Sequence, residues 1–189
     1  ISMIQKTILE NGIRVITEEI PHVHSVSVGV WVPSGSRNET REENGISHFI
    51  EHMLFKGTKR RSAQQIAKEI DAVGGILNAF TSKEFSSFYA KVLAEHLPVA
   101  VDLLFDLFLN SRFAAEEIER ERQVILQEIS MVEDTPDEYI HDLFSQSFWP
   151  RHSLGLPILG TTKTISRMDR KKLLEFFHGH FLRRMPILV

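Results

Sequence analysis

Two histidines and a glutamate stand close together in the stretch HFIEH at positions 48–52. Apolar residues recur around them every three to four positions, which predicts a helix over residues 45–55. Because residues four apart lie on one face of a helix, the imidazoles of His48 and His52 can converge on a single metal ion. Glu51 reaches the edge of the same site without having to bind the ion. This donor set suits zinc, which takes imidazole and carboxylate ligands and keeps one position for water.

The histidine pair alone does not establish a metal site, because two histidines four residues apart also occur by chance on amphipathic helices. The intervening Glu51 strengthens the interpretation, since the order H-x-x-E-H is the inverted zincin pattern. Such a site still needs a third protein ligand, which must come from elsewhere in the chain.

The best source of that ligand is the charged segment at residues 114–132, which we predict to be a long helix. Glu128 lies beside its apolar stripe, and Glu121 lies two turns earlier on the same side. A carboxylate held against a core needs a partner, because an unpaired buried charge is costly. From the residues alone, the partner of Glu128 is either a metal ion or an arginine side chain.

Composition excludes several classes of protein. The formal net charge of −3 over 189 residues gives no electrostatic reason to expect a nucleic acid or an anionic membrane as partner. The chain has no cysteine, so a metal must be held by nitrogen and oxygen. We see no signal-peptide pattern and no apolar run of the roughly 18 residues that span a bilayer. We therefore expect a bacterial cytoplasm or an organelle interior.

The order of predicted elements indicates an α+β domain, with helices packed on an antiparallel β-sheet. Asn11-Gly12 predicts a hairpin, and Ser62 with Gln65 predicts a capping box at a helix start. The strand at 77–82 is either an edge strand that pairs with another chain or a plain hairpin strand, and its residues alone favour the second. Strands are predicted at 3–9, 13–20, 25–32, 77–82 and 85–93, and helices at 45–55, 63–73, 97–110, 114–132, 136–148 and 165–178.

Several motifs at matching separations resemble the M16 family of inverzincin metallopeptidases, which includes the mitochondrial processing peptidase and pitrilysin. They are H-x-x-E-H at 48–52, F-K-G-T at 55–58, G-G-x-x-N-A at 74–79 and the glutamates at 121 and 128. The 76 positions from His52 to Glu128 match the processing-peptidase branch. The resemblance implies the LuxS/processing-peptidase-like metallohydrolase fold and one Zn²⁺ ion.

The resemblance also implies roles for individual residues of the metal centre. His48, His52 and Glu128 correspond to the zinc ligands. Glu51 corresponds to the general base that activates the zinc water. Glu121 corresponds to a second acid that supports catalysis.

Further correspondences concern the peptide substrate. Phe55 corresponds to a residue that lines the pocket for the side chain after the cut bond. The strand with Asn78, Ala79 and Phe80 corresponds to the edge strand to which the substrate adds, which reverses the preference for a plain hairpin strand. The resemblance therefore implies a zinc-dependent endopeptidase acting on extended peptides or presequences.

Family members consist of two similar halves that close over the peptide, and residues 1–189 resemble one domain, the N-terminal catalytic half. We therefore expect either a piece of a longer two-half protein or a chain that pairs with a second, M16-like subunit, possibly as a dimer. The isolated chain should then be an incomplete enzyme. The alternatives are a non-catalytic partner or structural subunit, which the complete H-x-x-E-H motif argues against, and a peptide-binding module without chemistry.

Overall fold

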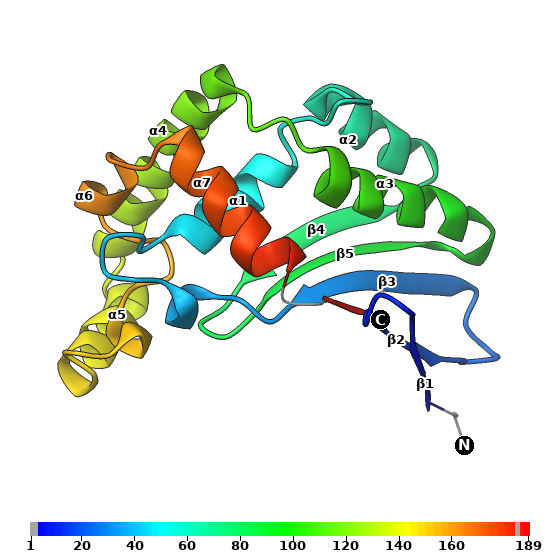
Figure 1. Ribbon diagram of the computed structural model, residues 1–189, viewed down its shortest axis with the longest axis horizontal. Coiled ribbons are helices and arrows are strands. Elements are labelled where there is room, and N and C mark those ends of the chain that lie inside the picture. Colours follow the sequence, from blue (N-terminus) through cyan, green and yellow to red (C-terminus); the bar gives the residue numbers. More distant parts are fainter. Residues whose placement is uncertain (1–3, 184–185) are drawn as a thin grey trace.

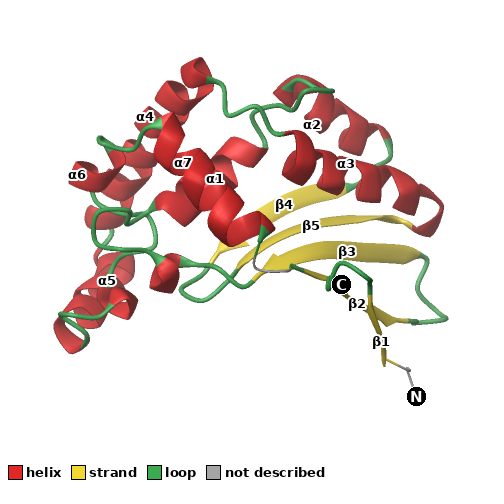
Figure 2. Ribbon diagram, viewed as in Figure 1, coloured by secondary structure: helices red, strands yellow, loops and turns green. Residues whose placement is uncertain are grey.

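The computed structural model describes residues 4–183 and 186–189 and consists of one six-stranded sheet with helices gathered over one face (Figures 1 and 2). The spatial order of the strands is β1-β2-β6-β3-β5-β4. The strands are β1 (Ile4–Ile8), β2 (Arg14–Glu18), β3 (Ser25–Val32), β4 (Ile76–Thr81), β5 (Ser86–Leu93) and β6 (Ile187–Leu188). The α+β class predicted from the order of elements is therefore confirmed.

The sheet is antiparallel except for one pair. Arg14 and Val15 of β2 lie opposite Ile187 and Leu188 of β6 in a parallel register. A parallel neighbour requires a long connection, and here strands β3 to β5 and all seven α-helices of the described residues lie between β2 and β6. The purely antiparallel sheet expected from the sequence is thus corrected at this position, because hairpin signals can predict only antiparallel neighbours.

Seven α-helices follow or interrupt the strands in the described part of the chain. They are α1 (Ile46–Leu54), α2 (Ala63–Ala72), α3 (Leu97–Asn110), α4 (Ala115–Glu133), α5 (Pro136–Phe148), α6 (Thr162–Ile165) and α7 (Arg170–Phe176), with a π-helical turn at Phe177–Leu182. The predicted capping box begins α2: the Ser62 hydroxyl accepts from the Gln65 N–H, and the Gln65 side chain accepts from the Ser62 N–H. Within the described residues, no helix combines the length and the apolarity needed to cross a membrane.

The helix expected at 165–178 begins five residues later than predicted, because Ile165 is the last residue of α6 and α7 starts at Arg170. Each of the two helices has its own N-terminal cap. Thr161 caps α6 through the N–H of Thr164, and Asp169 caps α7 by accepting from the Lys172 N–H at 2.8 Å. Side-chain caps of this kind start a new helix even where the apolar period continues.

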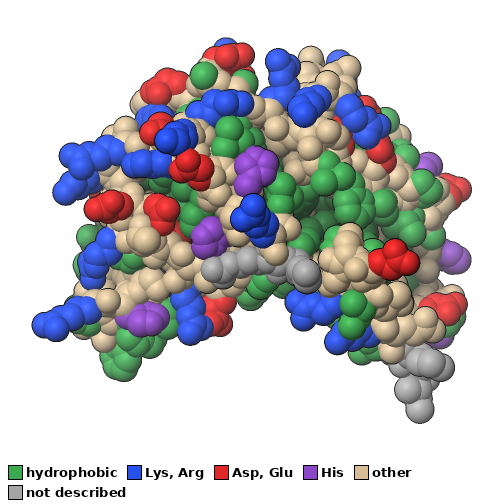
Figure 3. Space-filling model, in the orientation of Figure 1, with side chains coloured by type: hydrophobic (Ala, Val, Ile, Leu, Met, Phe, Trp, Pro, Cys, Tyr) green, Lys and Arg blue, Asp and Glu red, His purple; other side chains and the backbone are tan. Residues whose placement is uncertain are grey.

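The core lies between the sheet and the helices, and α1 is at its centre. Valines of β3 and residues of β5 face the same side, and Phe49 and Ile50 of α1 are fully buried against them. On its other side α1 contacts α4. Helix α1, the metal-motif helix that carries His48, Glu51 and His52, is therefore held between the sheet and α4. In the view of Figure 3, Lys and Arg side chains are interspersed with Asp and Glu rather than gathered into one basic face.

Candidate metal centre

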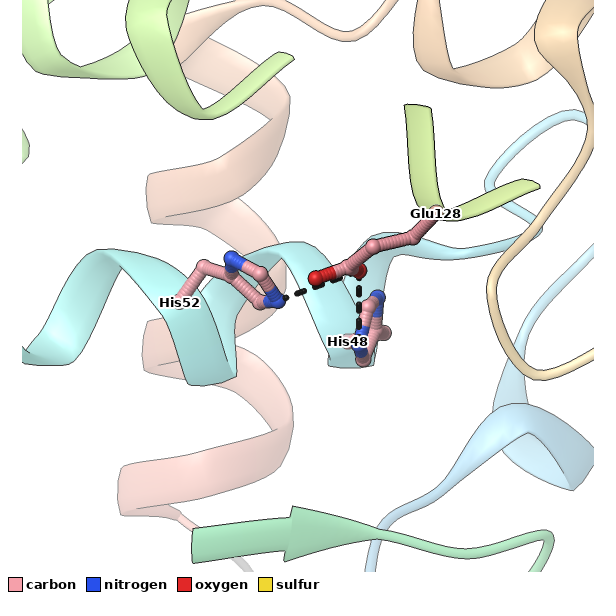
Figure 4. A group of neighbouring side chains, drawn as sticks. All are labelled: His48, His52 and Glu128. Atoms are coloured by element: carbon pink, nitrogen blue, oxygen red, sulfur yellow. Dashed lines mark ion pairs between the residues drawn. The ribbon is translucent and has the colours of Figure 1, made fainter. Parts of the chain in front are cut away.

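Helices α1 and α4 bring three predicted ligands together (Figure 4). The Oε2 atom of Glu128 lies 3.8 Å from Nε2 of His48 and 3.5 Å from Nε2 of His52. One candidate ligand atom from each residue lies within 4.8 Å of the other two. Donors about 2 Å from one tetrahedral zinc ion are separated by roughly 3–4 Å, so this donor set fits zinc in chemistry and in spacing. Among the described residues, Glu128 forms no ion pair with an arginine, so that alternative is not realised.

Burial keeps His48 in the form that binds metals. Desolvation, with a smaller contribution from nearby His52, lowers the pKa of His48 to about 3. The imidazole is therefore neutral at physiological pH, and a metal ligand must be neutral at its donor nitrogen.

Glu121 contacts the other nitrogen of His52. Its Oε2 lies 2.9 Å from His52 Nδ1, and its Oε1 lies 2.8 Å from the Lys56 ammonium. The side chain is buried, so both contacts act with little screening by water. A carboxylate at Nδ1 favours a proton there and leaves Nε2 free to face Glu128.

Glu51 lies on the side of α1 that faces the edge strand. The Thr81 hydroxyl, at the end of β4, donates a hydrogen bond to Glu51 Oε2. Burial raises the pKa of Glu51, although the Thr81 hydrogen bond and His52 oppose this. A carboxylate whose pKa is moved toward neutrality is better matched to accepting a proton from water.

A hollow beside the metal centre contains two carboxylates that the sequence analysis did not single out. Glu138 and Asp142 of α5 line it together with His48 and Glu51. Burial raises the pKa of Asp142, and the ammonium of Lys83 opposes this. The available signal was two acids four residues apart on one helix, but nothing in the sequence indicated which way α5 faces.

The residues predicted to contact substrate lie in two places. Phe55 ends α1 and lines a second hollow between α2 and β4. Strand β4 pairs only with β5, so its other edge is free within the described sheet. There the Ala79 N–H donates to Asn78 Oδ1 at 2.8 Å, and Phe80 is 40% exposed. The free edge of β4 lies beside α1, because the Thr81 hydroxyl at the end of β4 donates a hydrogen bond to Glu51 of α1.

Residues 14–162 match the sequence model of the family described as insulinase, peptidase family M16. The chain belongs to peptidase family M16. The uncharacterized zinc protease YmxG of Bacillus subtilis is 48% identical over 179 residues, which cover 95% of this chain and 44% of the relative. An uncharacterized zinc protease of Rickettsia felis is 47% identical over 92% of this chain and 42% of its own length. The chain thus spans less than half the length of these M16 relatives.

Solved structures agree with this membership. A protease from Helicobacter pylori superposes with a TM-score of 0.95 at 24% identity. The match covers 99% of this chain and 45% of that protease, and it shows similarity of fold alone. Pitrilysin has a TM-score of 0.87 at 25% identity, covering 100% of this chain and 21% of pitrilysin. The family and the fold expected from the motifs are confirmed.

Proposed function

We propose that the intact protein containing this chain is a zinc-dependent endopeptidase. The observation that carries the proposal is the convergence of His48, His52 and Glu128, with Glu51 on the same helix. Membership of family M16 and relatives named as zinc proteases support it.

His48, His52 and Glu128 would hold the metal through two imidazole nitrogens and one carboxylate. When bound, zinc would supply positive charge that lowers the pKa of water toward neutrality and polarises a carbonyl group. Glu51 accepts the proton of the attacking water and delivers it to the amine that leaves. Glu121 holds the His52 ring in the orientation that directs Nε2 to the centre.

The substrate is an extended peptide, such as a presequence, that adds to the free edge of β4. Along the segment Asn78, Ala79 and Phe80, main-chain hydrogen bonds to Ala79 give affinity, and side-chain hollows give preference. Phe55 lines the hollow for the residue after the cut bond.

A second M16-like half completes the enzyme, either later in the same polypeptide or as a separate chain. The relatives and structural neighbours support this, because this chain covers under half of each of them. A bacterial cytoplasm is the proposed compartment, since the relatives named above are bacterial.

The variants Glu51→Gln and His48→Ala, made in the intact protein, test the proposal. Glu51→Gln should keep stoichiometric zinc but lose hydrolysis of an extended fluorogenic peptide by about 10²–10⁴-fold, the usual contribution of a general base. His48→Ala should lose both zinc and hydrolysis. Zinc content and turnover are measured on the same samples.

Hydrolysis by Glu51→Gln at the unmodified rate would reject the role of Glu51. An unmodified protein that binds zinc and peptide without cleaving it would favour a non-catalytic subunit or a peptide-binding module instead.

A further inference from the structure

One carboxylate outside the metal centre is almost completely buried. Glu39 is 4% exposed and belongs to the polar segment that precedes α1. Its Oε2 accepts from the Gly45 N–H at 2.8 Å and from Asn44 Nδ2 at 3.1 Å, and its Oε1 accepts from the Ser47 N–H at 2.9 Å. Both oxygens are therefore committed to the first turn of the metal-motif helix.

These contacts replace an ordinary helix cap. Gly45 occupies the cap position with φ of 92° and has no side chain to accept the free N–H groups of the first turn. A larger residue would not fit, since a Cβ there would lie 2.7 Å from the Leu159 carbonyl oxygen. Glu39 supplies the acceptor from a distance, and its charge also complements the positive end of the helix dipole.

The same carboxylate lies where two further segments meet α1. Asn44 Nδ2 also donates to the Pro157 carbonyl at 2.8 Å, which ties the helix start to the loop before α6. The Arg37 N–H donates to the Lys83 carbonyl at 2.7 Å, in the turn that follows β4. Glu39 thus stands between the helix that carries Glu51 and the hairpin whose edge strand carries Thr81.

Burying a carboxylate at the start of a helix costs free energy, because the group loses its contacts with water. Desolvation raises the pKa of Glu39, and the hydrogen bonds from Ser47, Gly45 and Asn44 oppose this. A serine, threonine or asparagine cap would avoid burying a carboxylate, but the Leu159 carbonyl leaves no room for such a side chain at Gly45. The acceptor therefore comes from Glu39, and its hydrogen bonds tie the start of α1 to the preceding segment.

We infer that Glu39 is a positioning residue of the hydrolytic centre, because its carboxylate holds the first turn of α1, and with it His48 and Glu51, in place against the end of β4. The inference rests on the proposed function. Glu39 lies outside the metal donor set and acts only through the backbone of α1.

The test compares Glu39→Gln with Glu42→Gln in the intact protein. Glutamine keeps the shape but has one acceptor oxygen where the site presents three donors, whereas Glu42 is an exposed acid of the same segment. We expect Glu39→Gln to weaken zinc affinity, measured by competition with a chromogenic chelator, and to lower kcat, each by about tenfold, as supporting contacts of metal sites do. KM should stay within about twofold, and Glu42→Gln should match the unmodified protein.

The variant Glu39→Asp provides a second comparison, also if Glu39→Gln fails to fold. It keeps the charge and both oxygens on a shorter side chain, so we expect about threefold losses in zinc affinity and kcat. Unchanged zinc affinity and kcat in the folded variants would overturn the inference, as would a lowered Tm with both quantities unchanged. If the unmodified protein neither binds zinc nor cleaves peptide, the proposed function itself fails, and this inference fails with it.

Discussion

The ring of His52 lies between two carboxylates that act on its opposite nitrogens. Nδ1 is 2.9 Å from Glu121, and Nε2 is 3.5 Å from Glu128. Because a neutral imidazole carries one proton, a carboxylate at Nδ1 places the proton there and leaves Nε2 as the donor to a metal. Lys56 contacts the second oxygen of Glu121 at 2.8 Å and holds that carboxylate in place.

Replacing Glu121 by Gln should therefore weaken zinc binding. The amide can still accept from Nδ1–H, but it loses the charge and the ion pair to Lys56, so we expect about 10–100-fold lower zinc affinity or activity. Chelator competition and peptide turnover measure the two effects. Glu116→Gln, an exposed position on the same helix, serves as the matched control. Equal zinc affinity in both variants would contradict a supporting role for Glu121.

At the scale of elements, the proposed binding of substrate depends on the free edge of β4. The Ala79 N–H donates to the side chain of Asn78, which lies on the exposed side of the strand. An incoming peptide carbonyl can replace that side-chain oxygen and join the strand through its main chain.

The variant Ala79→Pro removes this donor. One lost hydrogen bond is worth about 0.5–1.5 kcal/mol, so KM for an extended peptide should rise by roughly two- to tenfold while kcat changes less. Ala79→Ser, which keeps the N–H, should behave like the unmodified protein. KM and kcat of both variants are measured by steady-state kinetics on the intact protein. A KM for Ala79→Pro equal to that of Ala79→Ser would show that the peptide does not bond at this position.

Elements with a strong local signal could be predicted from the sequence. The apolar period placed α1 and α4 within a residue or two, and the helix period put His48 and His52 on one face. The convergence of Glu128 needed the resemblance to M16, because the residues alone left an arginine partner equally open. The caps that divide α6 from α7 are local contacts, of Thr161 with Thr164 and of Asp169 with Lys172, and were overlooked. The parallel register of β6 and the direction in which the acids of α5 point were missed because they depend on tertiary contacts that no local pattern encodes.

At the scale of the whole molecule, this chain carries all three proposed zinc ligands and the base on two packed helices, whereas its M16 relatives are more than twice as long. We therefore expect the isolated chain to bind zinc but to hydrolyse peptides far more slowly than the intact protein, because half of the proposed substrate enclosure is lacking. The comparison is kcat/KM for one fluorogenic peptide at equal zinc loading. Equal values would show that no second half is needed.

The most direct test of the metal centre is X-ray diffraction from crystals of the zinc-loaded intact protein, recorded on both sides of the zinc absorption edge. The account predicts a single strong anomalous peak for this domain, about 2 Å from Nε2 of His48, Nε2 of His52 and a carboxylate oxygen of Glu128. No peak at that position, or a zinc ion held by other side chains while these three stay unligated, would contradict it.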